Sequence, residues 1–214
     1  HFKIVVTEIP DPEIWIKIGI IYLEKKKYDD AVPALKQALK LDPKSENAHE
    51  RLKEIHDYFF NKGNELATDR NFRPAADYLK KAFDTMRLPE TAKKAAEIYK
   101  QIDNVPMETK MTAEWKKIIA EEKSREEENM RQTFIAKSKI YLEKENYSKA
   151  AETLEAAFLM KVDQNIYLQL VTLYKNMNKK EALESLEARW EKMQQVDEAF
   201  KKHQKELNRK QKSD

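Results

Sequence analysis

The segment YLEKKKYDDAVPALKQAL, residues 22–39, returns in similar form as YLEKENYSKAAETLEAAF, residues 141–158. Upstream of the first copy, large and apolar residues recur at spacings of three and four, and a second stripe of small and apolar residues follows a charged turn. Two such stripes indicate two amphipathic helices that pack as a hairpin. The two stripes of the first copy are Trp15, Ile18, Gly19, Tyr22 and then Ala31, Leu35, Ala38, with Pro43 after the second.

The composition favours a thin stack of helices over one thick core. Of 214 residues, 37% are charged and 41% are hydrophobic, only two are glycine, and good helix formers dominate. Cysteine is absent, which excludes disulfides and thiolate metal sites. The net charge of +3 is near balance and does not itself call for a nucleic-acid partner. The composition therefore predicts an all-α protein.

Further copies of the hairpin pattern occupy most of residues 12–190. A close copy lies at 131–164, a looser one at 56–89, and a degenerate one at 90–120, where Met111, Trp115 and Ile118 form the second stripe. A fourth copy follows residue 164, and it is expected to have one residue fewer in its turn before Ala182 and Leu186. The spacing resembles the tetratricopeptide repeat (TPR) family, most closely at residues 12–45. That resemblance implies a stack of antiparallel helix pairs with a concave groove.

The repeat spacing breaks in two places, and each break predicts a long helix. The first two copies start 44 residues apart, so the surplus residues 46–55 predict an over-long helix from Glu46 to Ala67. The charged run 121–129 lacks apolar residues, but helix formers continue from Thr112 to Lys144. We expect one long helix there, either continuous or bent near the charged run, with a charged loop as the alternative. A third long helix is expected over Lys179–Asn208.

The predicted fold is an α-solenoid of antiparallel helix pairs, in which two repeat blocks are joined by a long charged helix and a long helix ends the chain. The expected organisation is an extended N-terminal segment at 1–11, a repeat block at 12–120, a charged helical linker at 121–130, a second block at 131–190, and a C-terminal helix with a basic tail at 191–214.

Catalytic or metal chemistry finds little support in the sequence. His49 and His56 share a helix face with Glu46, but no second carboxylate–histidine unit exists to complete a metal site, so both histidines are expected at the surface. Nucleophile, phosphate-loop and cofactor motifs are missing. We therefore expect a protein that is not an enzyme and that needs no cofactor and no metal.

The concave groove implied by the family resemblance is the best candidate site. In that family one face of each first helix lines the groove, and we expect the core not to need the residues on it. An apolar strip of this kind would bind a partner helix or an extended peptide, unless residues 2–9 or a neighbouring helix cover it. The face carries Ile16, Ile20 and Leu23 in the first copy, Phe60 and Asn64 in the second, Ile135, Lys139 and Leu142 in the third, and Leu168 and Thr172 in the fourth.

The end of the chain offers two further hypotheses. The apolar stripe of the last helix continues through Phe200 and Leu207, which predicts partner contact or a homodimer through this helix. Residues 201–214 are basic, which suggests an RNA-associated factor, although no aromatic residue in this run could stack on bases. Nucleic acid is the less favoured partner.

The sequence thus predicts a non-catalytic scaffold or adaptor that holds a protein or peptide in its groove within a larger assembly. No apolar run could span a bilayer and no signal peptide is visible, so the expected location is the cytoplasm. The chain begins at His1 rather than Met, so we expect either a tag remnant at its start or a cut from a longer protein.

Overall fold

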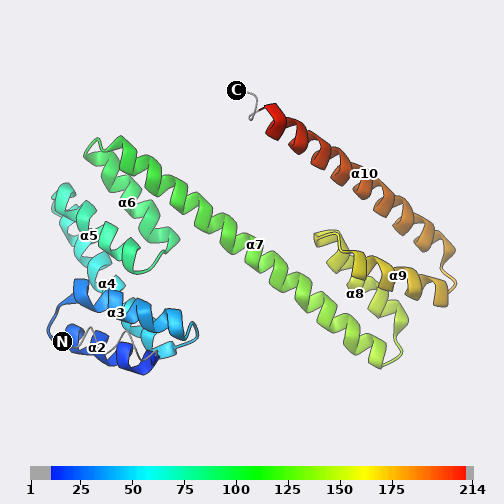
Figure 1. The fold of residues 1–214 in the computed structure, drawn as a ribbon, viewed down its shortest axis with the longest axis horizontal. Helices are drawn as coiled ribbons and strands as arrows, with labels where there is room; N and C mark the ends of the chain where they lie inside the picture. Colours follow the sequence, from blue (N-terminus) through cyan, green and yellow to red (C-terminus); the bar gives the residue numbers. More distant parts are fainter. Residues whose placement is uncertain (1–10, 211–214) are drawn as a thin grey trace. The chain divides into compact units, whose positions relative to one another are not determined.

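The computed structural model describes residues 11–210, with the side chains of positions 197, 200 and 203–210 outside the description. Within this range the chain forms helices and no strand, so the all-α prediction is confirmed (Figure 1). The predicted extended segment at 1–11 falls on residues 1–10, outside the described part. The helices are α2 (Pro12–Glu24), α3 (Tyr28–Leu41), α4 (Glu46–Thr68), α5 (Phe72–Thr85), α6 (Pro89–Gln101), α7 (Val105–Glu143), α8 (Tyr147–Met160), α9 (Gln164–Asn176) and α10 (Lys180–Lys210).

The three predicted long helices are all present. α4 contains 23 residues and begins after Ser45, whose side-chain oxygen accepts a hydrogen bond from the backbone N–H of Ala48. α7 contains 39 residues and runs through the charged segment 121–129 without a break. α10 contains 31 residues. The chain divides into two compact units, His1–Glu122 and Lys123–Asp214, so α7 belongs to both.

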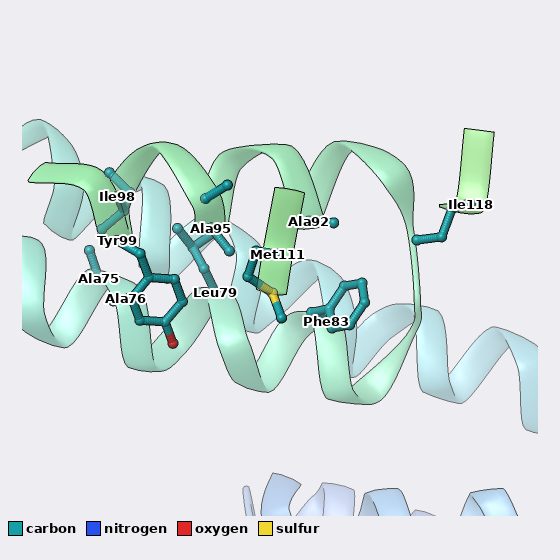
Figure 2. Close-up of a cluster of buried hydrophobic side chains, with 11 residues drawn as sticks. Ala75, Ala76, Leu79, Phe83, Ala92, Ala95, Ile98, Tyr99, Met111 and Ile118 are labelled. Atoms are coloured by element: carbon teal, nitrogen blue, oxygen red, sulfur yellow. The ribbon is translucent and has the colours of Figure 1, made fainter. Parts of the chain in front are cut away.

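The first unit is held by small residues packed beneath larger ones. Figure 2 shows Ala75, Ala76, Leu79 and Phe83 of α5 against α6 and α7. The α6 side contributes Ala92, Ala95, Ile98 and Tyr99, and α7 contributes Met111 and Ile118. The degenerate copy at 90–120 is therefore a packed hairpin, with Met111 and Ile118 in the buried positions that its sequence predicts. A second cluster joins α3 to α4 through Leu35, Leu52, Ile55 and Phe59.

The second unit repeats this arrangement with α8, α9 and α10. Its buried residues include Leu154 and Phe158 of α8, Leu170 of α9 and Leu186 of α10. Trp190 of α10 closes the cluster, because its ring stacks on that of Tyr167 with centroids 4.5 Å apart. The first part of α10 thus caps the stack.

Five turns of the same geometry connect the helices of five hairpins in the described chain. Each turn contains one non-glycine residue in the left-handed region, with φ between 54° and 60°. The backbone N–H of the following residue donates to the carbonyl five positions earlier, at 2.8 to 3.0 Å, which satisfies a helix-end carbonyl. The left-handed residues are Lys26, Arg70, Asp103, Glu145 and Asn178.

The expectation of a shorter turn in the fourth copy is wrong. The N–H of Lys179 donates to the carbonyl of Tyr174, as that of Lys27 donates to the carbonyl of Tyr22 in the first copy. The difference of one residue lies inside α10 instead. Buried Leu186 comes eight positions after the left-handed residue Asn178, whereas Leu35 comes nine positions after Lys26. Turn geometry is therefore uniform, and the register of the second helix varies.

In each of the first two hairpins the helices approach so closely that one position of the first helix has no room for a side chain. A Cβ atom built on Gly19 would lie 2.6 Å from the Cγ of Leu35, and one on Gly63 would lie 2.8 Å from the Cγ of Leu79. Both leucines are fully buried. In the third copy the matching position is Ser138, which is buried and donates its hydroxyl to the carbonyl of Ile135 at 2.7 Å.

A buried ion pair secures the start of α9 in the second unit. Arg131 of α7 is 6% exposed and donates to Glu128 at 3.1 Å and to Asp163 at 2.8 Å. The Asp163 carboxylate also caps α9 by accepting from the backbone N–H groups of Asn165 and Ile166. The hydrogen bond from Ile166 is the main cause that lowers the pKa of Asp163 below its usual value, and Arg131 lowers it further.

We predict that Lys26→Gly stabilises the first hairpin. Glycine adopts the left-handed conformation without the steric cost that a Cβ atom carries, which is about 1 kcal/mol per residue. The urea midpoint of the full chain, followed by circular dichroism, should therefore rise. Lys25→Gly is the matched control, because Lys25 has a φ of −86° and gains nothing from glycine. A midpoint that falls equally in both variants would contradict the role of the left-handed turn.

We predict that Gly19→Ala destabilises the chain although alanine is the better helix former. The propensity gain is about 1 kcal/mol, whereas overpacking against the buried Leu35 costs roughly 1–3 kcal/mol. The urea midpoint should fall, while Lys17→Ala on the exposed face of α2 should leave it unchanged or raise it. A higher midpoint for Gly19→Ala would show that Leu35 can move aside.

The Asp163 carboxylate predicts a specific acid sensitivity. Because the folded pKa lies below the unfolded one, its contribution is complete above the unfolded pKa and is lost as pH falls toward the folded pKa. Asp163→Asn keeps an acceptor for the helix cap but removes one of the two charge partners of Arg131 and leaves only Glu128. The variant should therefore unfold at lower urea at about pH 7 and lose less further stability between about pH 5 and pH 3 than wild type. Glu152→Gln on α8 is the control and should retain the wild-type profile.

Candidate functional site

Two adjoining hollows between α4 and α6 form a groove in the first unit. Their volumes are about 350 and 500 Å³, and both are lined by Asn64, Lys94 and Glu97. Phe60, Glu90 and Lys93 complete the smaller hollow, and Ala67, Thr68, Phe72, Ile98 and Gln101 complete the larger one. We call the two together the α4/α6 groove.

The repeat geometry determines which side chains face this groove. Phe60 and Asn64 lie one turn apart on α4, and Lys93 and Glu97 stand 33 positions later on α6. The left-handed turn residues of these two hairpins, Arg70 and Asp103, have the same separation, so the positions are equivalent. Equivalent positions on successive first helices share a face of the stack. The structure thus brings the predicted residues Phe60 and Asn64 together with two charged side chains.

Phe60 and Asn64 offer different chemistry within the groove. Phe60 is half-buried, with its ring 5.7 Å from that of His56 and packed against the core, so only part of it is available to a partner. The side-chain amide of Asn64 takes no hydrogen bond from the described residues. An amide has two donors and a carbonyl acceptor, so it can pair with both groups of a peptide backbone.

The groove carries charges of both signs. Lys93 lies over the Trp115 ring at 5.5 Å from its centroid, and Lys94 lies 3.5 Å from the Glu97 carboxylate. Glu90 adds a second carboxylate at the edge of the smaller hollow. These surface pairs contribute little to stability, so the same groups can exchange their partners for those of a bound segment at low cost.

The predicted apolar strip on α2 is largely covered. Ile16 is 1% exposed and packs with Ala38 and Ala48, so the expectation that the core does not need Ile16 is wrong. The cause is the over-long α4, whose extra N-terminal turns include Ala48 and lie on α2. Ile20 packs against the same cluster and is half-buried, and Leu23 is half-buried against the neighbouring core cluster.

In the second unit the predicted groove residues divide between core and surface. Ile135 and Leu142 are half-buried against the cluster formed by α8 and α9. Lys139 is exposed, and Leu168 is 51% exposed. Thr172 is also exposed and donates its hydroxyl to the carbonyl of Leu168 at 2.9 Å. The predicted contact residues Phe200 and Leu207 lie outside the described side chains.

The prediction of two surface histidines is wrong for His56. This side chain is buried, with its Nδ1 2.9 Å from the Asp57 carboxylate and its Nε2 2.8 Å from the Thr91 hydroxyl. It therefore joins α4 to α6 just beneath the groove. His49 is exposed, and its Nε2 lies 3.0 Å from the carbonyl of Pro43. The described residues contain no group of three or more His, Cys, Asp or Glu side chains arranged for a metal ion.

Sequence reasoning missed Lys93 and Glu97 as groove residues. Adding the 34 residues of the family repeat to Phe60 and Asn64 leads to Lys94 and Ile98, one position beyond these two residues, so the repeat length alone indicates this part of α6 but not the register. In the copy at 90–120 the apolar stripes are too irregular to show which of its residues correspond to those of the other copies. Its turn at Asp103 establishes that register in the structure.

Comparison with known proteins places the repeat in a family. Residues 12–45 match the sequence model of the tetratricopeptide repeat. No curated protein sequence matches the chain. Over residues 11–210, no helix combines the length and the apolar character that a bilayer span requires.

Several solved structures share the helical-hairpin architecture at low identity. The structure of PilF from Pseudomonas aeruginosa is 15% identical, with 85% of this chain and 91% of that chain covered at a TM-score of 0.27. BtubC from P. vanneervenii is 10% identical, with 86% and 80% covered at a TM-score of 0.33. The TPR domain of P58(IPK) is 16% identical, with 78% and 47% covered at a TM-score of 0.28. At TM-scores below 0.5 these likenesses support no functional conclusion.

The family match at residues 12–45 coincides with the α2–α3 hairpin and the start of α4. The same turn then recurs four times along the described chain. Such repeats generally serve as non-catalytic scaffolds for protein interaction. Residues 12–45 are thus a tetratricopeptide repeat, and the rest of the described chain is similar to it in its recurring helical hairpins.

Proposed function

We propose that this protein is a non-catalytic adaptor that binds an extended segment or a helix of a partner protein in the α4/α6 groove. The observation that carries the proposal is the alignment of Phe60 and Asn64 with Lys93 and Glu97 along one hollow. The groove differs from the apolar strip that the sequence predicted, because it combines the rings of Phe60 and Phe72 with side-chain amides and several charges.

Each part of the groove has a separate role in this proposal. Asn64 pairs with the backbone of the bound segment, since its amide is both donor and acceptor. Phe60 contributes apolar burial of about 25 cal/mol per Å² before entropic costs. Lys93 and Glu97 set the register and the association rate, because exposed charges act more on those than on affinity.

The groove supports recognition better than catalysis. Its titratable side chains are carboxylates and lysines, and the hydroxyl of Thr68 donates to the carbonyl of Asn64 at 3.0 Å. A nucleophile activated by a neighbouring base would need a hydroxyl or thiol that faces such a base. The lining residues do not form that arrangement.

We predict that Asn64→Ala and Lys93→Glu each reduce partner capture at least about tenfold while leaving helicity intact. Neither side chain belongs to the buried core, and alanine is favourable in a helix. The measurement compares proteins retained by the immobilised full chain, quantified by mass spectrometry. Lys100→Glu, an exposed change on α6 outside the groove, is the matched control and should retain the same proteins.

Retention that is equal for all three variants would refute the α4/α6 groove as the binding site. Retention that collapses between low and moderate salt and is removed by nuclease would support the RNA-associated alternative instead, because phosphate contacts are strongly salt-dependent.

A further inference from the structure

A second hollow, in the other unit, lies where α10 meets the loop between α8 and α9. Its volume is about 780 Å³, within the range of specific ligand pockets. Four apolar side chains line it: Val162 from the loop and Trp190, Met193 and Val196 from α10. We call this hollow the α10 notch.

The notch arises from the unequal lengths of two neighbouring helices. α9 has 13 residues and α10 has 31, and the two pack as an antiparallel hairpin, so α10 continues past the start of α9. The ring of Trp190 stacks on that of Tyr167 and lies tilted against that of Phe158, and Met193, three positions further along α10, still packs against the cluster. Beyond it, Val196 is 64% exposed. An apolar stripe therefore leaves the core and continues along α10 at the notch.

The charged residues that line the notch share one sign. They are Arg189 and Lys192, with Gln194 as the remaining polar member. Arg189 also donates to Glu155 of α8 at 3.2 Å, which holds its guanidinium beside the notch. The notch thus combines an apolar floor with a basic rim, and a complementary partner has an apolar stripe flanked by carboxylates.

We propose that the α10 notch is a second interaction site, which takes an amphipathic helix of a partner protein with an apolar stripe flanked by acidic residues. The partner's apolar side chains pack between Val162 and the stripe of α10, as one helix packs on the next within each hairpin. Its carboxylates face Lys192 and Arg189. A second copy of the chain is the poorer occupant, because residues 201–214 would bring further lysines and arginines toward Lys192.

This site is separate from the proposed groove and would give the chain two binding elements. The α4/α6 groove belongs to the first unit and the α10 notch to the second. An adaptor with two sites can join two partners, or can hold one partner more tightly than either site alone.

The test uses designed helical peptides of about 18 residues, a length that forms about five turns. One carries a leucine stripe flanked by glutamates, a second has the same stripe flanked by lysines, and a third replaces the leucines of the first with alanines. Binding to the full chain is measured by the anisotropy of labelled peptide. The glutamate-flanked leucine peptide should bind at least about tenfold more tightly than either of the others.

Matched variants test whether the peptide binds at the α10 notch. Val196→Glu should weaken binding of the glutamate-flanked leucine peptide at least about tenfold, because it adds a carboxylate to an exposed apolar position. Ile140→Glu, at an exposed isoleucine of α7 in the same unit, should leave binding unchanged. Lys93→Glu in the α4/α6 groove should also have no effect, so failure at one site is distinguishable from failure at the other.

Three results would overturn the proposal. One is equal affinity for the glutamate-flanked and lysine-flanked peptides. Another is unchanged binding in Val196→Glu. The third is a doubled mass of the peptide-free chain in light scattering that Val196→Glu abolishes, because a second copy would then occupy the notch.

Discussion

The close approach of two helices within each hairpin is the constraint on which the remaining structure depends. In the first two hairpins Leu35 and Leu79 occupy the space where Gly19 and Gly63 lack a Cβ atom, so the helices meet backbone to side chain. Close-packed interiors leave no room for even one extra methyl group at such points. Within the first unit, α4 and α6 then each present one face to the same hollow.

A uniform turn propagates this arrangement along the chain. Each of the five turns uses one residue in the left-handed conformation and the same return hydrogen bond, although none of them uses glycine. Variation is confined to helix length and to register after the turn, as in α4 and α10. The extra length of α4 covers α2, so the open groove lies between α4 and α6 instead. The extra length of α10 leaves part of its apolar stripe uncovered beyond Trp190.

The two departures from regular repetition thus generate the two candidate sites. The α4/α6 groove combines an aromatic ring, an amide and charges of both signs, which suits a peptide backbone with a mixed sequence. The α10 notch is apolar with a basic rim, which suits an amphipathic helix of opposite charge. The lining residues of both suit the recognition role that we propose for the chain.

The amino-acid sequence by itself determined the helical hairpins, their approximate boundaries and the three long helices, because spacings of three and four, small residues and helix formers are local properties. The one-residue shift that relates Phe60 to Lys93, rather than to Lys94, came from the turn at Asp103 in the structure. Only the tertiary structure decided that Ile16 and His56 are buried. Periodicity shows which residues share a face, but burial depends on what covers that face. Here the cover is the extra turns of α4 over Ile16 and the start of α6 over His56.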